Sequence, residues 1–422
     1  MSLRYLDLSD SESESDLIDD YALETVTESS ELQSSGPQDS EDDEDDVSST
    51  LDSAGSTTEG EESVVSFPRF SDAGSVASSA TSFTYNPSSV SSSSSGDPDQ
   101  DQLDLIQVTP ELHASLYKQE YGRTLNSSSD SYRLPADDEE MDRLHRQHKI
   151  VERVMGRYPA PLLAILQSDV VGEKRAIDLG CGNGDWIREI ATDFPNCSVV
   201  GVDLIPIPGD IAALPQNVWT EIDNVNLGLS HFYNSFDVVH ARLISSGVQN
   251  YRRMIDEIAH VVRPGGLIEL AECDCFTYDV NHNRIDATPD EISPPWWPRW
   301  LSFFREAIRF GGGNTEAANG LHTWVSNHPA FENVVYEATY FPVIPARDHD
   351  QNDPLLSNMK VVLLTLMRGG RPALLKRGHS EETIDTLEYN AVREINESNS
   401  PMFTRLERVY AIRNNTVVGP VP

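Results

Sequence analysis

The sequence is poor in cysteine and contains no long apolar run, and each shortage excludes a class of protein. Its 422 residues include four cysteines, whose spacings fit neither a disulfide framework nor a paired Cys-x-x-Cys zinc site, so we expect a reducing compartment. Apolar runs such as 361–367 are far shorter than the roughly 20 residues of a membrane span. The first residues lack the basic and apolar regions of a secretion signal. We therefore expect no membrane span and no secretion.

Basic residues are also scarce. The chain has 31 Lys and Arg against 69 Asp and Glu, which gives a formal net charge of -38. A protein that binds nucleic acid by neutralising phosphates needs clustered basic side chains. We therefore expect no direct binding of nucleic acid.

The acidic charge is concentrated in the first 100 residues, which hold 24 acidic side chains and only two basic ones. This segment is rich in serine and has few large apolar residues, so burial cannot offset the entropy of ordering it. We expect a disordered acidic tail over residues 1–102. It either keeps the protein in solution without a specific partner or, with serines phosphorylated, docks protein partners.

The remaining residues are typical of an α/β fold. A helical pattern over 137–156 begins at an acidic cluster that complements the helix dipole, and we assign residues 103–160 to an N-terminal helical cap. We assign residues 161–422 to the main domain. Its short β-branched runs alternate with helical patterns, which predicts a parallel sheet wound by helical crossovers. The strands are expected at 175–179, 198–203, 236–241 and 266–271, and the helices at 185–193 and 251–262.

The pattern changes after residue 290. We expect a helix after the Pro- and Trp-rich segment 294–300, a strand at 332–344, a helix from a Ser380 cap to about residue 395, and a last strand at 405–412.

The sharpest motif is Asp178-Leu-Gly-Cys-Gly-Asn-Gly184, where the first expected strand turns into a helix. Its glycines permit a tight turn and the close approach of a ligand. The dinucleotide fingerprint is G-x-G-x-x-G with a phosphate on the helix N-terminus, whereas the spacing here is G-x-G-x-G and Asp178 would repel a phosphate. There are two alternatives. The turn either serves only to pack a helix on a strand, or it forms a nucleotide-phosphate site.

Acidic residues at the ends of the expected strands favour a different cofactor. Asp178 suits a cationic ammonium group, and Asp203, at the end of the second strand, suits ribose hydroxyls. Asp223 follows the third strand position and suits the amino group of an adenine. A ligand with a ribose, an ammonium group and no phosphate is S-adenosylmethionine, which we expect as the cofactor.

The segment 176–185 resembles motif I of the class I methyltransferases, and 263–267 resembles the turn into their fifth strand. Further pieces resemble the fungal LaeA-like (TAM-domain) methyltransferases. They are Tyr132-Arg-Leu-Pro135 with Arg143-Leu144 and Gln147-His148, the segment 236–242, and the strand near Val409-Tyr410. The resemblance covers 115–415 and leaves the acidic tail outside. Residues 402–415 lack the Gly-Arg-Lys-Pro type of ending that is expected of the family. It implies a Rossmann-like class I methyltransferase fold with a mostly parallel seven-stranded sheet and helices on both faces.

The resemblance also implies the site. The cofactor residues it implies are Asp178, Gly180, Cys181, Gly182, Gly184, Asp203, Asp223, Asn224, Tyr132, His148 and Arg242. Tyr132 and His148 either close over the cofactor from the cap or pack the cap against the sheet. Arg242 either holds a carboxylate of the substrate or cofactor or pairs with a nearby acid. His240 is the candidate catalytic base, with a hydrogen-bonded structural role as the alternative.

Two other motifs concern a possible metal site and a possible lid over the substrate. Cys273-x-Cys275 has acidic neighbours but no second cysteine pair and no histidine cluster, so we expect no metal. Trp296, Trp297 and Trp300 form either a lid over the substrate or part of the core, and core packing is favoured.

These features predict a methyltransferase that uses S-adenosylmethionine on an unidentified small-molecule or protein acceptor, and the resemblance adds regulation of secondary metabolism. The alternative is a methyltransferase-like interaction protein that binds the cofactor but acts mainly through protein partners. The resemblance implies a nuclear location, although Lys174-Arg175 is too short for an import signal. The cytoplasm is the alternative location.

Overall fold

The computed structural model describes residues 110–167, 172–209, 213–345, 353–419 and 421, together with the backbone of strands β1 (Thr25–Ser29) and β2 (Phe83–Tyr85). The expected disordered tail lies outside these residues apart from the two strands, and it stays a prediction. Within the described part of the chain, no helix is long and apolar enough to cross a membrane.

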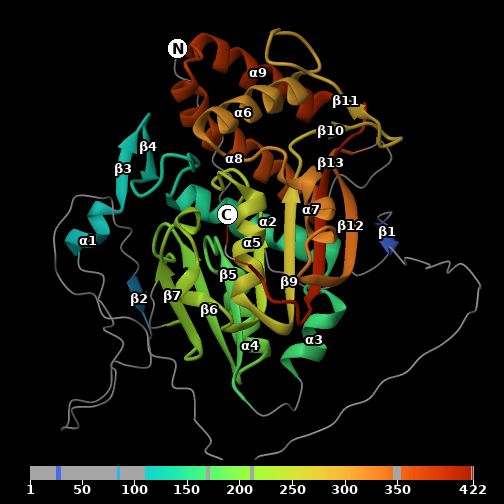
Figure 1. Ribbon diagram of the computed structural model, residues 1–422. Helices are drawn as coiled ribbons and strands as arrows, with labels where there is room; N and C mark the ends of the chain where they lie inside the picture. The colour runs from blue at the N-terminus through green and yellow to red at the C-terminus, as the bar shows by residue number, and fades with distance from the viewer. Residues whose placement is uncertain are drawn as a thin grey trace, which may run out of the picture.

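A mixed sheet forms the centre of the molecule (Figure 1). Its main path runs in the order β7, β6, β5, β8, β9, β13, β12. β5 to β9 pair in parallel along this path, whereas β13 is antiparallel to both of its neighbours. The strands are β5 (Lys174–Leu179), β6 (Cys197–Asp203), β7 (Val218–Ile222), β8 (Phe236–Arg242), β9 (Val262–Cys273), β12 (Phe331–Ile344) and β13 (Met402–Arg413). This confirms the mostly parallel seven-stranded sheet.

Short elements extend this sheet. β1 pairs with β12 at one edge and β2 pairs with β7 at the other. β10 (Thr277–Tyr278) pairs with β13 and with β11 (Arg284–Ile285). Two 3-10 turns, η3 (Val225–Leu227) and η4 (Ser230–Phe232), lead from β7 to β8.

Helices cover both faces of the sheet, because alternate side chains of the parallel strands enter different apolar clusters. In β5, Ile177 and Leu179 join the cluster that contains α5 (Tyr251–Val261) and α7 (Ala317–Ser326). Ala176 joins the cluster that contains α3 (Ala160–Leu166) and α4 (Asp185–Asp193). The expected helix 185–193 is confirmed at both ends.

A further group of helices lies beyond the carboxyl ends of the parallel strands (Figure 1). It consists of α2 (Asp138–Met155), α6 (Trp296–Gly311), α8 (Pro354–Arg377) and α9 (Glu381–Glu397), which share one apolar cluster. We call these four helices the helical cap; only α2 belongs to the N-terminal cap expected from the sequence, so the observed cap includes more of the chain. Trp297 and Trp300 are 1% and 0% exposed and stack at 5.6 Å in that cluster, so both pack in the core as favoured.

The helical cap therefore draws on two distant parts of the chain. Asp137 caps α2, since its carboxylate accepts a hydrogen bond from Glu140 N at 3.2 Å. A helix α1 (Pro110–Ser115) and a hairpin of β3 (Tyr117–Glu120) and β4 (Arg123–Asn126) precede α2. The sequence did not indicate this hairpin or α8. The division at residue 160 stays a prediction.

Candidate functional site

The Gly-rich turn after β5 is fixed to β6 by backbone hydrogen bonds. Gly180 N and Cys181 N donate to Val202 O at 2.8 and 2.9 Å. Gly180 has a φ of 78°, and a Cβ there would lie 2.4 Å from Ile244 Cγ2. Only glycine fits this position without a shift of its neighbour.

Asp203 ends β6 beside this turn. Its carboxylate accepts hydrogen bonds from Gly182 N at 2.8 Å and from Ile205 N at 3.4 Å. Burial raises the pKa of Asp203 to about 6, although these backbone donors lower it. The carboxylate lines a cavity of about 270 Å³ at the carboxyl ends of the strands. Hydroxyl donors of a ribose entering this cavity would favour the charged form of Asp203.

Asp178 and His240 lie side by side because β5 and β8 pair in parallel with these two residues in register. Asp178 Oδ1 is 2.7 Å from His240 Nδ1, and the two residues are 4% and 2% exposed. The imidazole also stacks on Trp186, with ring centroids 4.3 Å apart. His240 thus makes the structural hydrogen bond that the sequence left as an alternative. Its role as a base stays a prediction.

Arg242 ends β8 and reaches the cap helix α2. Its Nη2 donates to His148 Nδ1 at 2.6 Å, so its closest described partner is a histidine and not an acid. A neutral imidazole that accepts at Nδ1 carries its proton on Nε2. His148 Nε2 lies 3.0 Å from Glu189 Oε1 on α4, which matches that tautomer.

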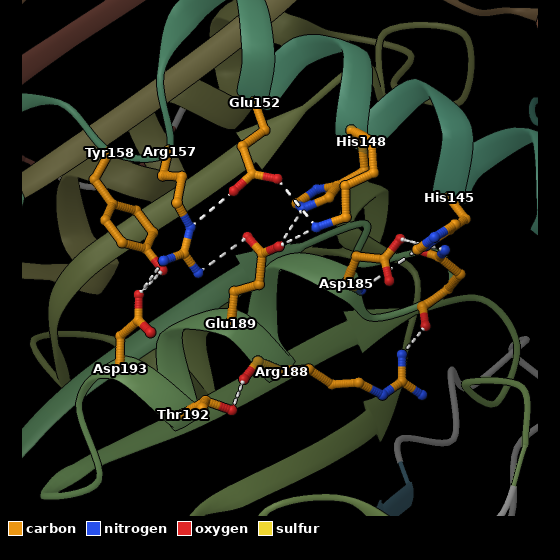
Figure 2. A network of polar contacts seen from close by, with 12 residues as sticks. His145, His148, Glu152, Arg157, Tyr158, Asp185, Arg188, Glu189, Thr192 and Asp193 are labelled. Carbon is orange, nitrogen blue, oxygen red and sulfur yellow. Dashed lines mark hydrogen bonds and ion pairs between the residues drawn. The ribbon is translucent and has the colours of Figure 1, made fainter. Parts of the chain in front are cut away.

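A polar network continues from this contact along the interface between α2 and α4 (Figure 2). Glu189 accepts from Lys149 Nζ at 2.8 Å. Burial raises the pKa of Glu189, but His148 and Lys149 outweigh it and lower this pKa to about 2. Farther along, Tyr158 Oη donates to Asp193 Oδ2 at 2.9 Å. The network fastens α2 to α4.

The structure brings the predicted site residues to one cavity, with Gly184 as the exception. The lining includes Tyr132, His148, Asp178, Gly180, Cys181, Gly182, Asp203, Asp223, Asn224, His240 and Arg242. Gly184 instead forms the N-cap of α4, with a φ of 80°. The ring of Tyr132 lies against Gly247, where a Cβ would come within 3.1 Å of its Cδ2. The assignment of these residues to cofactor contact stays a prediction.

Glu272 is a cavity residue that the sequence analysis did not assign. It lies near the end of β9 and is 0% exposed. Its Oε1 accepts from Ile244 N at 2.9 Å, Ser245 N at 3.1 Å and Tyr251 Oη at 3.0 Å. Burial raises the pKa of Glu272 to about 7. An acid directly after the expected strand 266–271 was the available signal, the same one that identified Asp203.

Neither cysteine of the Cys-x-Cys motif lies in a cluster of metal-ligating side chains among the described residues. Cys273 Sγ lies 3.4 Å from Thr404 Oγ1, and Cys275 Sγ donates to the Cys273 carbonyl at 3.8 Å. Both cysteines border the cavity.

Comparisons with known proteins agree with this geometry. A family model described as a methyltransferase domain matches residues 177–268, from β5 into β9. The secondary metabolism regulator laeA of Coprinopsis cinerea is 43% identical over 100% of this chain and 98% of its own length. The chain belongs to the LaeA-like methyltransferase family. It is a class I methyltransferase that depends on S-adenosylmethionine.

Two further relatives of this LaeA-like chain match smaller parts of it. Methyltransferase pytC of Aspergillus terreus is 31% identical over 54% of this chain and 67% of its own length. The regulator laeA of Aspergillus fumigatus is 32% identical over 37% of this chain and 40% of its own length. A solved phosphoethanolamine N-methyltransferase of Haemonchus contortus has a TM-score of 0.34 and 15% identity over 64% of this chain and 57% of that chain, which is too little similarity to bear on function.

The Coprinopsis comparison corrects one expectation. Because that alignment covers 100% of this chain, it extends through the acidic tail, which we had placed outside the resemblance. The tail is recognisable by its composition alone and has no motif, so its sequence gave no sign of this similarity.

Proposed function

We propose that this methyltransferase transfers a methyl group to an oxygen or nitrogen atom of an acceptor bound in the cavity, and that it regulates secondary metabolism in this way. The observation that carries the proposal is that Asp178, Asp203 and Asp223 converge on one cavity at the ends of three parallel strands. The regulatory part is supported by 43% identity to a regulator over nearly its whole length. A nuclear site of action belongs to the proposal and rests on the same similarity.

The cavity has the donors and acceptors that the cofactor requires. Asp203 and Asp223 line this cavity. In the proposal, Asp203 would accept hydrogen bonds from the ribose hydroxyls and Asp223 would accept one from the adenine amino group. The backbone of Gly180 and Gly182 borders the cavity, and Ile244 and Leu144 pack where a side chain at these positions would lie. These residues would hold S-adenosylmethionine with its charged end near Asp178.

Bound S-adenosylmethionine supplies an electrophilic methyl carbon on a sulfonium. In the transfer, the acceptor atom would bond to this carbon in place of the sulfur, which would leave with the electron pair, and a base of the cavity would take the acceptor's proton. The chain must align the two reactants and exclude water. The network between α2 and α4 serves the second task, because it fastens the cap over the cavity.

Regulation that needs the cofactor and regulation that does not predict different outcomes in the source organism. In an Asp203→Ala strain with normal protein levels, we expect the secondary-metabolite profile of a deletion strain, because regulation requires cofactor binding. A parental profile in that strain, with a changed profile in the deletion strain, would favour action through partners and contradict the proposal. Removal of residues 1–100 is the complementary change, and a methyltransferase-driven regulator should retain its effect without them.

A further inference from the structure

The cavity extends from the strand ends into the helical cap. Its inner part is lined by apolar side chains of three cap helices, and we call it the apolar chamber. These side chains include Ile150 of α2, Leu301 and Phe304 of α6, and Val362, Leu363 and Leu366 of α8. The residues that hold the cofactor in the proposal do not account for this part.

The apolar chamber lies inside the cap and not on its surface. Leu301, Phe304 and Leu363 are 4%, 3% and 5% exposed and belong to the apolar cluster shared by the cap helices. The side chain of an acceptor residue on a folded protein would have to pass between packed helices to reach them. A small molecule can enter such a space without bringing a polypeptide backbone with it.

The charges around the chamber lie on one side of it. Among the described residues, α6 and α8 contribute no charged side chain to the cavity lining. The charged groups come from the strand ends, from Asp185 at the start of α4, and from α2, where Arg143 is already paired with Glu140 at 2.7 Å. A lysine or arginine acceptor in the chamber would lose its hydration without gaining a partner there, which is costly.

Arg242 lies where the chamber meets the strand ends. Its guanidinium has only hydrogen-bond donors, and its one described hydrogen bond is to His148 Nδ1. A donor-only group at this junction matches an oxygen on the ligand and opposes an ammonium. The junction therefore favours an acceptor with an oxygen at its polar end.

We propose that the methyl acceptor is a small, mostly apolar molecule, aromatic or alkyl, whose single hydroxyl lies near Arg242 while its body fills the apolar chamber. The inference rests on the proposed function and names its substrate class. In the reaction the hydroxyl oxygen bonds to the methyl carbon as the carbon–sulfur bond breaks, and the hydroxyl proton leaves to a carboxylate or imidazole of the cavity. The products are a methyl ether and the neutral thioether of the cofactor.

The test uses 2-naphthol and 1-octanol as neutral probes of the chamber, with calorimetry on the full chain in the presence of S-adenosylhomocysteine. We expect at least one probe to bind. Leu366→Trp, which fills the chamber, should weaken probe binding at least tenfold and leave cofactor affinity within twofold. Val362→Phe is a second, milder filling variant and should act in the same direction. Val361→Trp is the control, because Val361 is on the same helix but 38% exposed and outside the lining.

The outcomes separate the two proposals. If neither probe binds the protein in the presence of S-adenosylhomocysteine, or if both filling variants bind the probes normally, the apolar chamber is not the acceptor site. Transfer of labelled methyl to a lysine-containing peptide, without binding of either neutral probe, would likewise overturn the inference. If the intact chain does not bind the cofactor, the proposed function fails, and the inference falls with it.

Discussion

The two halves of the cavity are built in different ways. The half at the sheet is formed by residues at the ends of neighbouring strands, and the parallel register of β5, β6 and β8 brings Asp178, Asp203 and His240 together. The half in the cap is formed by α2, α6 and α8, which are separated by long stretches of chain and meet only by packing. The first half carries the acids and the second carries the apolar surface, so the sheet is suited to the cofactor and the cap to the acceptor.

Removing a large side chain from the cap tests whether the second half depends on packing. Trp300 is 0% exposed and stacks on Trp297 and Phe304. We expect Trp300→Ala to lower the free energy of unfolding by about 4 kcal/mol, from lost burial and the cavity left behind. Urea unfolding checks this, and Trp296→Ala, at a half-buried neighbour, should cost less than half as much. Equal costs would mean that Trp300 has no special place in the core.

Changing Glu272 tests the electrostatics of the sheet half. Its pKa is raised from 4.5 to about 7 by burial, so between these values the folded protein holds a proton that the unfolded chain has lost. The contribution of Glu272 to the free energy of unfolding is therefore fully present below pH 4.5 and is lost as the pH rises through 7. The total loss is about 3 kcal/mol. In Glu272→Gln, we expect the loss of stability between pH 5 and 8 to shrink by up to that amount.

The measurement is urea unfolding of both proteins at the two pH values. Glu397→Gln, at a side chain that is 64% exposed, is the control and should keep the pH dependence of the parent. An unchanged pH dependence in Glu272→Gln would show that this carboxyl is not held in its neutral form.

His240 is the residue at which a structural and a catalytic role can be separated. Its hydrogen bond orients Asp178, so we expect His240→Ala to weaken cofactor binding about tenfold, through loss of a charge-assisted hydrogen bond. Calorimetry and steady-state kinetics on the same variant test this, with His322→Ala on α7 as the control. Unchanged cofactor affinity with turnover abolished would assign His240 as the base instead.

The smallest effect is expected where the halves are fastened together. Glu189→Gln weakens the contacts of α4 with His148 and Lys149 on α2, which should cost about 1 kcal/mol of stability, because the pair is only partly buried. Thermal unfolding at low and high salt measures the change, and the parent should lose more stability than the variant on salt addition. Asp286→Asn, at a side chain that is 76% exposed, is the control. No difference between Glu189→Gln and this control would show that the network does not fasten the cap.

The sequence predicted the elements whose signal lies in neighbouring residues of the chain. The short β-branched runs and the helical pattern between them located β5, β6, β8 and α4 within a few positions, and the glycines marked the turn. Helix α8 was not predicted because it contains Gly369, Gly370 and Pro372, each of which disfavours a helix. Its packing explains the exception: a Cβ at Gly370 would lie 3.0 Å from Phe304 and Trp300, so glycine allows α8 to approach α6 closely. Contacts of this kind join residues far apart in the chain, and no local pattern reveals them.

The assignment of the sheet half to the cofactor is the central claim, and calorimetry with S-adenosylmethionine and S-adenosylhomocysteine on the full chain tests it most directly. We expect both to bind the parent, and Asp203→Ala to weaken binding at least tenfold, because the ribose loses a carboxylate acceptor. Affinity in the parent should also fall below about pH 6 as Asp203 takes up a proton. No heat with the parent, or equal affinity in Asp203→Ala, would contradict the account.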